Sequence, residues 1–259
     1  MKQKYLNAFS WVWNYFFRFK LPGLPAVDPR YIPPFARVIF PLVGTAAGAM
    51  VYFACLLIRY VIGNTAAILF FVFTGVFLLD MLRKFRGFKL FCTWCNRRFH
   101  GSSPEDALDF TQPESWKEKD LPEQLLPFTI YIFRGVLFGL LAWHHAAVWS
   151  VFALTGSFLV MAELASLRDE RTWNELIPVP EGFAMYHWFA AGLALLVFGV
   201  FTGHPGGAVA TFLIAWGMTK YGRYLHERLD DLITIKQLEY WGYFTEMCLL
   251  LAGALLAGH

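Results

Sequence analysis

Charged residues are scarce in this chain of 259 residues, since Asp, Glu, Lys and Arg make up 16% of it. Soluble domains carry about 25%. Hydrophobic residues make up 57%, and the four cysteines are too few for a disulfide scaffold. This composition excludes a soluble globular domain and a disordered chain. The net charge of +3 is small and scattered, so we expect no binding to nucleic acid. The P-loop, GxGxxG, HExxH and GxSxG motifs are also absent.

Long apolar runs take the place of the missing charge. About 20 apolar residues cross a bilayer as a helix, because its hydrocarbon core is about 30 Å thick. The sequence predicts an all-α, polytopic membrane bundle with about seven transmembrane helices, forming a single membrane domain over residues 1–259. The predicted spans are Val38–Ile58, Tyr60–Leu79, Leu125–Trp143, Ala146–Leu164, His187–Gly203, Gly206–Thr219 and Tyr240–Gly258.

The N-terminal segment, residues 1–34, is aromatic but too polar to span, so we expect a helix between Tyr5 and Phe19 that lies in the membrane interface.

The distribution of basic residues indicates the orientation of the chain in the membrane. With the N-terminus inside, 20 of the 22 fall in residues 1–37, before the first span, and in the loops at 80–124, 165–186 and 220–239. The sequence therefore predicts a bacterial inner-membrane protein with a cytoplasmic N-terminus and a cytoplasmic loop at 83–124.

Three short motifs follow one another within residues 10–82. They are the run Phe17–Pro22, then Pro41–Gly44 with Gly48-Ala49 four residues on, then Thr74-Gly75 ahead of Leu78-Leu79-Asp80. In order and spacing they resemble the cobalamin synthase family, membrane transferases that join α-ribazole or its phosphate to adenosylcobinamide-GDP and release GMP. The resemblance implies a related fold, a nucleotide-activated corrinoid as partner, Mg²⁺ as cofactor and a catalytic role for Asp80.

The sequence departs from that family where the chemistry is expected. The family's DGLADTxDG motif has carboxylates at its first, fifth and eighth positions, whereas this chain has Asp80, Lys84 and Gly87 there. A single carboxylate is a poor Mg²⁺ site. Arg83 and Arg86 are gained close by, so direct cationic contact with a pyrophosphate can replace metal bridging. The resemblance therefore indicates the fold more strongly than the activity.

Ionisable residues within or beside the predicted spans need partners, because an unpaired charge in a bilayer costs at least about 2.5 kcal/mol. Arg134 and Glu246 differ in depth by about 5 Å, which predicts an intramembrane ion pair; the alternative is that each faces its own watery cavity. Asp80, Glu163 and Glu239 all lie near inner ends of spans. They are candidate ligands of a metal site, or simply solvated carboxylates at the membrane rim.

The histidines support a second interpretation. The segment from His187-Trp188 to Thr202-Gly203-His204 looks like the haem-bearing spans of b-type cytochromes, although its two histidines lie about 26 Å apart and cannot share one haem. His144 lies level with His204, and His226 lies level with His187. The alternative function is thus a non-enzymatic subunit of a larger membrane complex that binds haem b or a chlorophyll-type pigment. Rim histidines without a cofactor are the competing interpretation.

Cys92 and Cys95 form a CxxC pair in the predicted cytoplasmic loop. A structural zinc site needs four ligands, and only His100 is near. Covalent haem attachment is excluded because Asn96 follows where a histidine is required. We therefore expect two reduced thiols without a metal.

Overall fold

The structure is a computed structural model that describes residues 2–17, 36–83, 86–110, 121–165, 185–229 and 233–257. Within these ranges the chain is helical and forms no strand, so the all-α prediction is confirmed for them. The helices are α1 (Lys2–Phe16), α2 (Ala36–Val61), α3 (Asn64–Phe73), the π-helical turn η1 (Thr74–Leu78), α4 (Leu79–Leu82), α5 (Arg86–Phe99), α6 (Pro104–Ala107), α7 (Leu121–Trp143), α8 (Trp149–Leu164), α10 (Tyr186–Phe201), α11 (Pro205–Leu229) and α12 (Ile235–Ala257).

Four helical segments are long and apolar enough to cross a membrane: Val38–Val61, Asn64–Leu82, Leu125–Trp143 and Lys236–Ala257. The prediction of an integral membrane protein is therefore supported, whereas the count of seven spans is not confirmed. Two of the remaining predicted spans are the apolar helices α8 and α10, of 16 residues each. A helix of that length rises about 24 Å, which is less than the hydrocarbon core.

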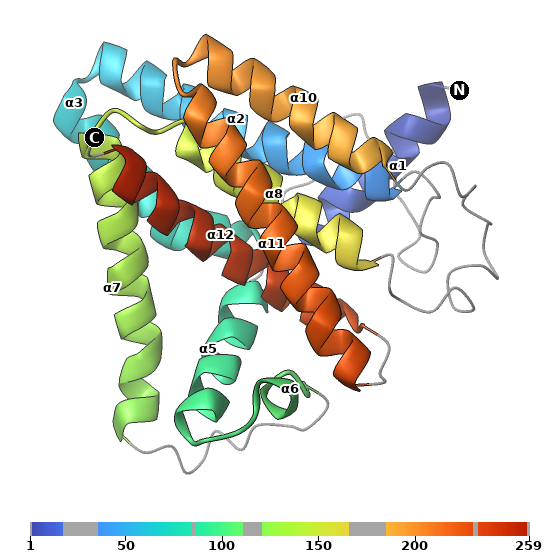
Figure 1. Cartoon of the computed structure of the whole chain (residues 1–259). Coiled ribbons are helices and arrows are strands. Elements are labelled where there is room, and N and C mark those ends of the chain that lie inside the picture. The colour runs from blue at the N-terminus through green and yellow to red at the C-terminus, as the bar shows by residue number, and fades with distance from the viewer. Residues whose placement is uncertain are drawn as a thin grey trace.

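Helix α8 occupies the centre of the molecule, where α2, α10, α11 and α12 pack around it (Figure 1). Every residue of α8 except Glu163 is buried. Because this helix is apolar on all sides, it has no face that favours water, and packing against other helices buries all of it. Its position inside the bundle explains how so short an apolar helix is accommodated.

The closest helix contact joins α2 to α8. A Cβ atom added at Gly44 would lie 2.4 Å from the carbonyl oxygen of Leu154, and one added at Gly48 would lie 2.5 Å from Cα of Val151. The hydroxyl groups of Thr45 and Thr155 are hydrogen bonded across the same contact at 2.9 Å. Small residues four apart thus let the two backbones touch, as in membrane helix pairs.

A π-helical turn interrupts the helical rod formed by residues 64–82. At η1 the backbone N–H of Leu79 donates to the carbonyl of Thr74, five residues earlier. Gly75 lies against the ring of Phe138, and a Cβ there would come within 2.3 Å of that ring. One inserted residue rotates the following side chains by about 100° relative to a continuous α-helix, and such turns often accompany functional sites. In this chain the side chains that follow include Asp80.

The predicted cytoplasmic loop at 83–124 contains two helices, α5 and α6, and α5 packs against α12. Tilted aromatic pairs make this contact, because Phe91 lies 5.4 Å from Tyr243 and Trp94 lies 5.5 Å from Tyr240 between ring centroids. At the N-terminus, α1 packs on α2 with Val12 and Trp13 buried. Residues 18–35 of the predicted interfacial segment and 111–120 of the loop lie outside the described residues.

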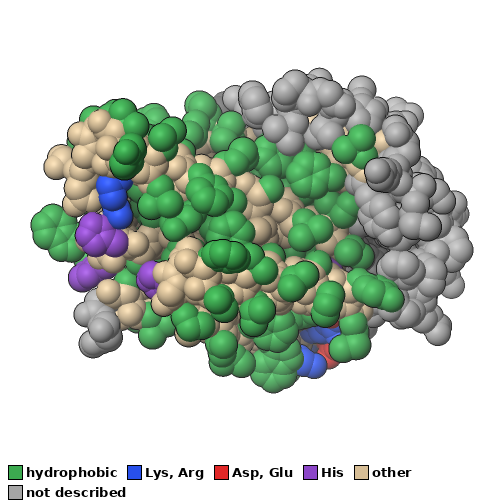
Figure 2. Space-filling view, turned by 90° about the horizontal axis from the view of Figure 1, so that it is seen from above, with side chains coloured by type: hydrophobic (Ala, Val, Ile, Leu, Met, Phe, Trp, Pro, Cys, Tyr) green, Lys and Arg blue, Asp and Glu red, His purple; other side chains and the backbone are tan. Residues whose placement is uncertain are grey.

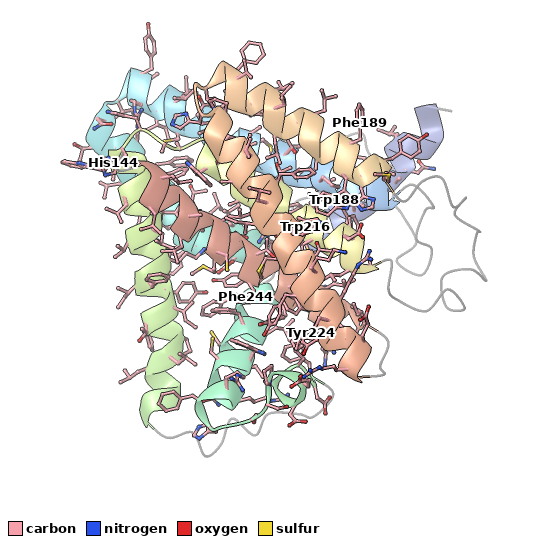
Figure 3. All side chains as sticks on the ribbon, in the orientation of Figure 1. His144, Trp188, Phe189, Trp216, Tyr224 and Phe244 are labelled. Atoms are coloured by element: carbon pink, nitrogen blue, oxygen red, sulfur yellow. The ribbon has the colours of Figure 1, made fainter. Side chains whose placement is uncertain are left out.

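The outer surface of the bundle has the character of a lipid-facing one. Seen from above, the described part of the surface is mostly hydrophobic, and charged side chains show only at its margins (Figure 2). Large aromatic side chains point outward along α10 and α11, including Phe189, which is 71% exposed, and Trp216, which is 53% exposed (Figure 3). In water such exposure would favour aggregation, whereas in a bilayer it is ordinary lipid contact.

Candidate functional site

A network of charged side chains lies buried where α4, α7 and α12 meet. Arg134 of α7 is fully buried, and its guanidinium group lies 2.6 Å from both the Asp80 carboxylate of α4 and the Glu246 carboxylate of α12. The same guanidinium donates a hydrogen bond to the Tyr243 hydroxyl at 3.2 Å. The ion pair expected from the depths of Arg134 and Glu246 is thus present, as part of a larger network that also holds Asp80.

Two further arginines extend the network toward the start of α5. Arg83 pairs with the second oxygen of Glu246, and Arg86 lies 3.2 Å from Glu239. Arg83 and Arg134 balance Asp80 and Glu246 in the buried network, and Arg86 with Glu239 forms a neighbouring, partly exposed pair, so the formal charges cancel in both. Because isolated charges are costly in a membrane, this pairing is what allows the cluster to be buried.

Aromatic rings complete the surroundings of Arg134. Its guanidinium carbon lies 5.0 Å from the ring centre of Tyr243 and 5.7 Å from that of Phe138. Both distances are within the range of a cation–π contact, which is stronger away from water. The rings therefore stabilise the arginine charge on the sides that the carboxylates do not cover.

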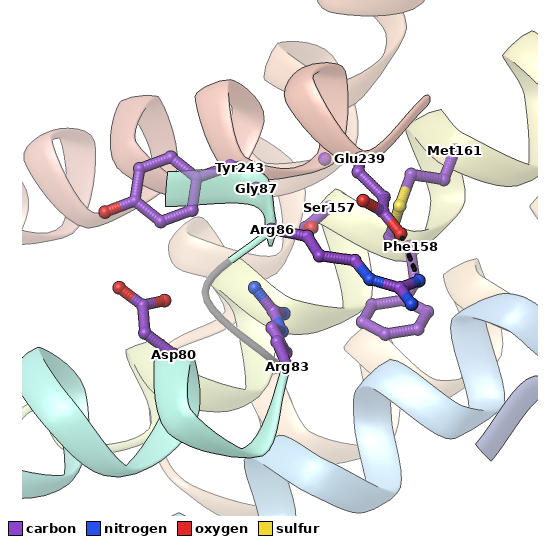
Figure 4. A pocket seen from close by; sticks show the side chains of 10 residues that line it. Asp80, Arg83, Arg86, Gly87, Ser157, Phe158, Met161, Glu239 and Tyr243 are labelled. Atoms are coloured by element: carbon purple, nitrogen blue, oxygen red, sulfur yellow. Dashed lines mark hydrogen bonds and ion pairs between the residues drawn. The ribbon is translucent and has the colours of Figure 1, made fainter. Parts of the chain in front are cut away.

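A cavity opens beside this network, between α4, α5, α8 and α12 (Figure 4). Its free volume is small, about 30 Å³. Its lining residues are Asp80, Arg83, Arg86, Gly87, Ser157, Phe158, Met161, Glu239, Gly242 and Tyr243. Two glycines allow the helices around it to pack closely: a Cβ at Gly87 would lie 3.0 Å from Cβ of Tyr243, and one at Gly242 would lie 2.6 Å from Sδ of Met161.

The structure does not bring the three predicted metal ligands Asp80, Glu163 and Glu239 to one point. Asp80 and Glu239 line the cavity, whereas Glu163 pairs with Arg223 and His187. Among the described residues, no three His, Cys, Asp or Glu side chains gather in a way that could hold a metal ion. The physical reason is that each of these carboxylates is already neutralised by a basic side chain of a neighbouring helix.

The resemblance implies Mg²⁺ near Asp80. The residues present do not fit that ion, because two of the three carboxylates of the family motif are missing. Lys84 and Gly87 stand at the motif's other two acidic positions, and Lys84 lies outside the described residues. Asp80 itself lies 2.6 Å from Arg134. A carboxylate whose charge is already balanced by an arginine attracts a divalent cation less strongly, so we assign no metal to this site.

Three of the four predicted haem ligands contact protein groups. Buried His187 pairs with Glu163, which also accepts a hydrogen bond from Trp188 at 2.9 Å. Buried His226 accepts a hydrogen bond from the indole of Trp241 at 3.3 Å through Nε2. Nδ1 of His204 lies 2.7 Å from the Thr202 carbonyl. The contacts of His187 and His226 thus join neighbouring helices, and the contact of His204 lies within the turn between α10 and α11.

His144 is exposed at the end of α7 (Figure 3). It begins the short turn to α8, in which His145 adopts a left-handed backbone conformation with φ of 60°. The turn is the expected outer connection between two predicted spans. Its exposure is compatible with the rim-histidine interpretation.

Two partners of the site were not found from the sequence. Tyr243 lies three residues before Glu246, so the two share one face of α12, and this helical spacing was an available signal. Ser157 of α8 lines the cavity, but nothing in the uniform apolar pattern of that helix sets it apart.

Comparison of the chain with family models, with curated proteins and with solved structures found no match.

Proposed function

We propose that this protein is a cobalamin-synthase-like integral membrane protein that binds a nucleotide-activated corrinoid, adenosylcobinamide-GDP, at the cavity beside Asp80. One observation carries the proposal. The segment that corresponds to the family's acidic motif contributes Asp80, Arg83, Arg86 and Gly87 to the lining of a single cavity. The same stretch of chain would therefore meet the ligand, with Arg83 and Arg86 next to the positions at which the family has metal-binding acids.

Arginine is suited to the diphosphate of such a ligand, because its planar guanidinium group donates two parallel hydrogen bonds to phosphate oxygens. Arg86 is 43% exposed. Its ion pair with Glu239 therefore contributes little to stability, as is typical of ion pairs in contact with solvent. It can therefore exchange that partner for a phosphate. The Nε and Nη2 atoms of Arg83 are buried and make no hydrogen bond, so they are donors that a phosphate oxygen would satisfy after a small movement.

The proposed interaction is direct contact between arginine and diphosphate, without Mg²⁺. Transfer of the nucleotide-linked group requires neutralisation of charge on the reacting phosphate. In this chain the only motif acid, Asp80, is balanced by Arg134. We therefore propose binding without release of GMP, and the catalytic role that the resemblance implies for Asp80 becomes a role in holding Arg134 in place.

A binding titration tests the proposal. Purified protein in lipid nanodiscs is titrated with adenosylcobinamide-GDP, with Mg²⁺ or with EDTA, and bound corrinoid is measured by its absorption. We expect saturable binding in EDTA, weakened about tenfold or more by Arg86→Gln, because a hydrogen bond to a charged group is worth about 1.5–3 kcal/mol. Arg98→Gln is the matched control, since Arg98 lies on the same helix and donates to the Ser102 carbonyl.

Each outcome has a definite meaning. No saturable binding to the wild-type protein would refute the proposal, and binding that disappears in EDTA would refute direct arginine contact. GMP formed in the presence of α-ribazole would show that transferase activity is retained. A Soret band that shifts on reduction, or subunits that copurify with a protein free of corrinoid, would favour the membrane-complex subunit instead.

A further inference from the structure

A second cavity lies on the other side of α4 from the ionic network. Its free volume is about 180 Å³. Its walls come from the end of α1, from α2 and from the rod of residues 64–82: Trp13, Phe17, Ala47, Met50, Val51, Ala54, Phe70, Thr74, Leu78, Leu79 and Leu82. No lining residue is charged, and the Thr74 hydroxyl oxygen is itself buried. The surface offered to a ligand is therefore apolar throughout.

Helix α4 forms the wall between the two cavities. Leu79 and Leu82 line the apolar cavity, whereas Asp80 and Arg83 line the charged one. The two pairs point in different directions because successive residues of a helix are rotated by about 100°. Across the wall, the ring of Phe17 stacks on that of Phe158 at 6.1 Å between centroids. The two sites are thus separate in their chemistry although they are neighbours.

We propose that the apolar cavity binds one acyl chain of an anionic phospholipid of the cytoplasmic leaflet. Met50 lines the cavity and is 51% exposed, so the cavity opens to the outside of the bundle at α2. Because α2 is a candidate membrane span, the medium at that opening is lipid hydrocarbon. A void inside a packed bundle forfeits dispersion contacts, and a chain of methylene groups restores them without requiring a hydrogen bond.

Charge favours an anionic lipid over a neutral one. Two lining segments are followed in the sequence by basic residues outside the ionic network: Phe17 is followed by Arg18, and Lys84 stands two residues after Leu82. Basic residues next to a span attract anionic headgroups by roughly 1 kcal/mol each. The predicted orientation places these ends of the segments at the cytoplasmic leaflet, where anionic lipid is bound most readily.

Photo-cross-linking of the wild-type protein tests the proposal without a mutation. The full chain is reconstituted in phosphatidylcholine vesicles with trace phosphatidylglycerol that carries a diazirine in its acyl chain, and labelled peptides are identified by mass spectrometry. We expect labelling at Met50 or Ala54 that excess unlabelled phosphatidylglycerol reduces at least fivefold. Leu213, an exposed residue of α11, is the reference for unspecific lipid contact and should change less than twofold. Equal competition at both places would overturn the proposal.

A cavity-filling variant gives a second readout. Ala54→Phe places a ring in the cavity, and we expect native mass spectra of the detergent-purified protein to lose retained phosphatidylglycerol at least fivefold. Ala194→Phe is the matched control, because Ala194 is a half-buried alanine of the apolar helix α10 outside this cavity. Unchanged lipid retention in a folded Ala54→Phe protein, or equal retention of phosphatidylcholine, would overturn the proposal. This binding is independent of the corrinoid proposed above.

Discussion

Replacing Arg134 by methionine tests whether the ionic network holds α4, α7 and α12 together. Methionine keeps much of the length of the side chain but removes the charge that faces both Asp80 and Glu246. Glu246 retains Arg83 as a partner, so most of the loss falls on Asp80. Breaking a buried ion pair by removing one partner costs about 3–5 kcal/mol, and we expect the free energy of unfolding to fall by that amount.

A second substitution separates lost pairing from lost packing. In Arg134→Met with Asp80→Asn, the carboxylate that Arg134 neutralised is also absent, so no uncompensated charge stays buried at that position. We expect the double variant to be more stable than the sum of the single changes by about 1–3 kcal/mol. This coupling energy is the direct measure of the Asp80–Arg134 interaction.

Unfolding is measured by titrating detergent-solubilised protein with sodium dodecyl sulfate and following helicity by circular dichroism. Arg59→Met is the control, because Arg59 lies in the last turn of α2 and makes a long hydrogen bond of 3.4 Å to the Ala142 carbonyl. Its free energy of unfolding should change by less than about 0.5 kcal/mol. An Arg134→Met protein within about 1 kcal/mol of wild type, or a double variant without recovery, would refute the reasoning.

Three further predictions concern other parts of the molecule. Gly48→Ala should lower the free energy of unfolding by about 1–3 kcal/mol, because the new methyl group meets the α8 backbone at 2.5 Å. Gly217→Ala is the control: its methyl group meets open space, so the variant should be neutral or stabilising in the same titration. Burial raises the pKa of the Cys95 thiol to about 11, so the reactive thiolate fraction should rise about tenfold per pH unit from pH 8 to 10. The rate of alkylation of Cys95, measured by mass spectrometry, should rise in the same proportion, and a plateau below pH 9 would contradict this. Glu163→Gln removes the charge that pairs with Arg223 and should cost about 1–3 kcal/mol in the unfolding titration; a change within 0.5 kcal/mol would argue against that pairing.

The helices were predictable because a bilayer imposes a strong local rule. Every long apolar run must form a helix to satisfy its own backbone hydrogen bonds, so the run at 125–143 marks most of α7. The same rule leaves the surroundings of α8 open, since a run of apolar residues does not reveal whether lipid or protein surrounds it. Burial on all sides is a property of the assembled bundle, and the 16 residues of α8 are enclosed by other helices.

For the charged site, the sequence predicted only the depth of each residue along the membrane normal. Depth along the membrane normal follows from residue counting, and it placed Arg134 level with Glu246. Rotation about each helix axis does not follow from counting, because neighbouring helices and the π-helical turn at Thr74–Leu78 decide which way Asp80 and Arg83 point. For the same reason the three carboxylates expected at one level divide between two separate ionic clusters.

The sequence by itself therefore determined the membrane character, the helical segments and the depth of each charge. These depend on hydrophobicity and on the rise per residue, which are local properties of the chain. The tertiary structure alone decided which charges neutralise one another, which glycines admit close helix contact, and where two cavities of opposite chemistry form on either side of α4. Those outcomes depend on how helices distant in sequence rotate and pack, and a one-dimensional pattern carries no information about that rotation.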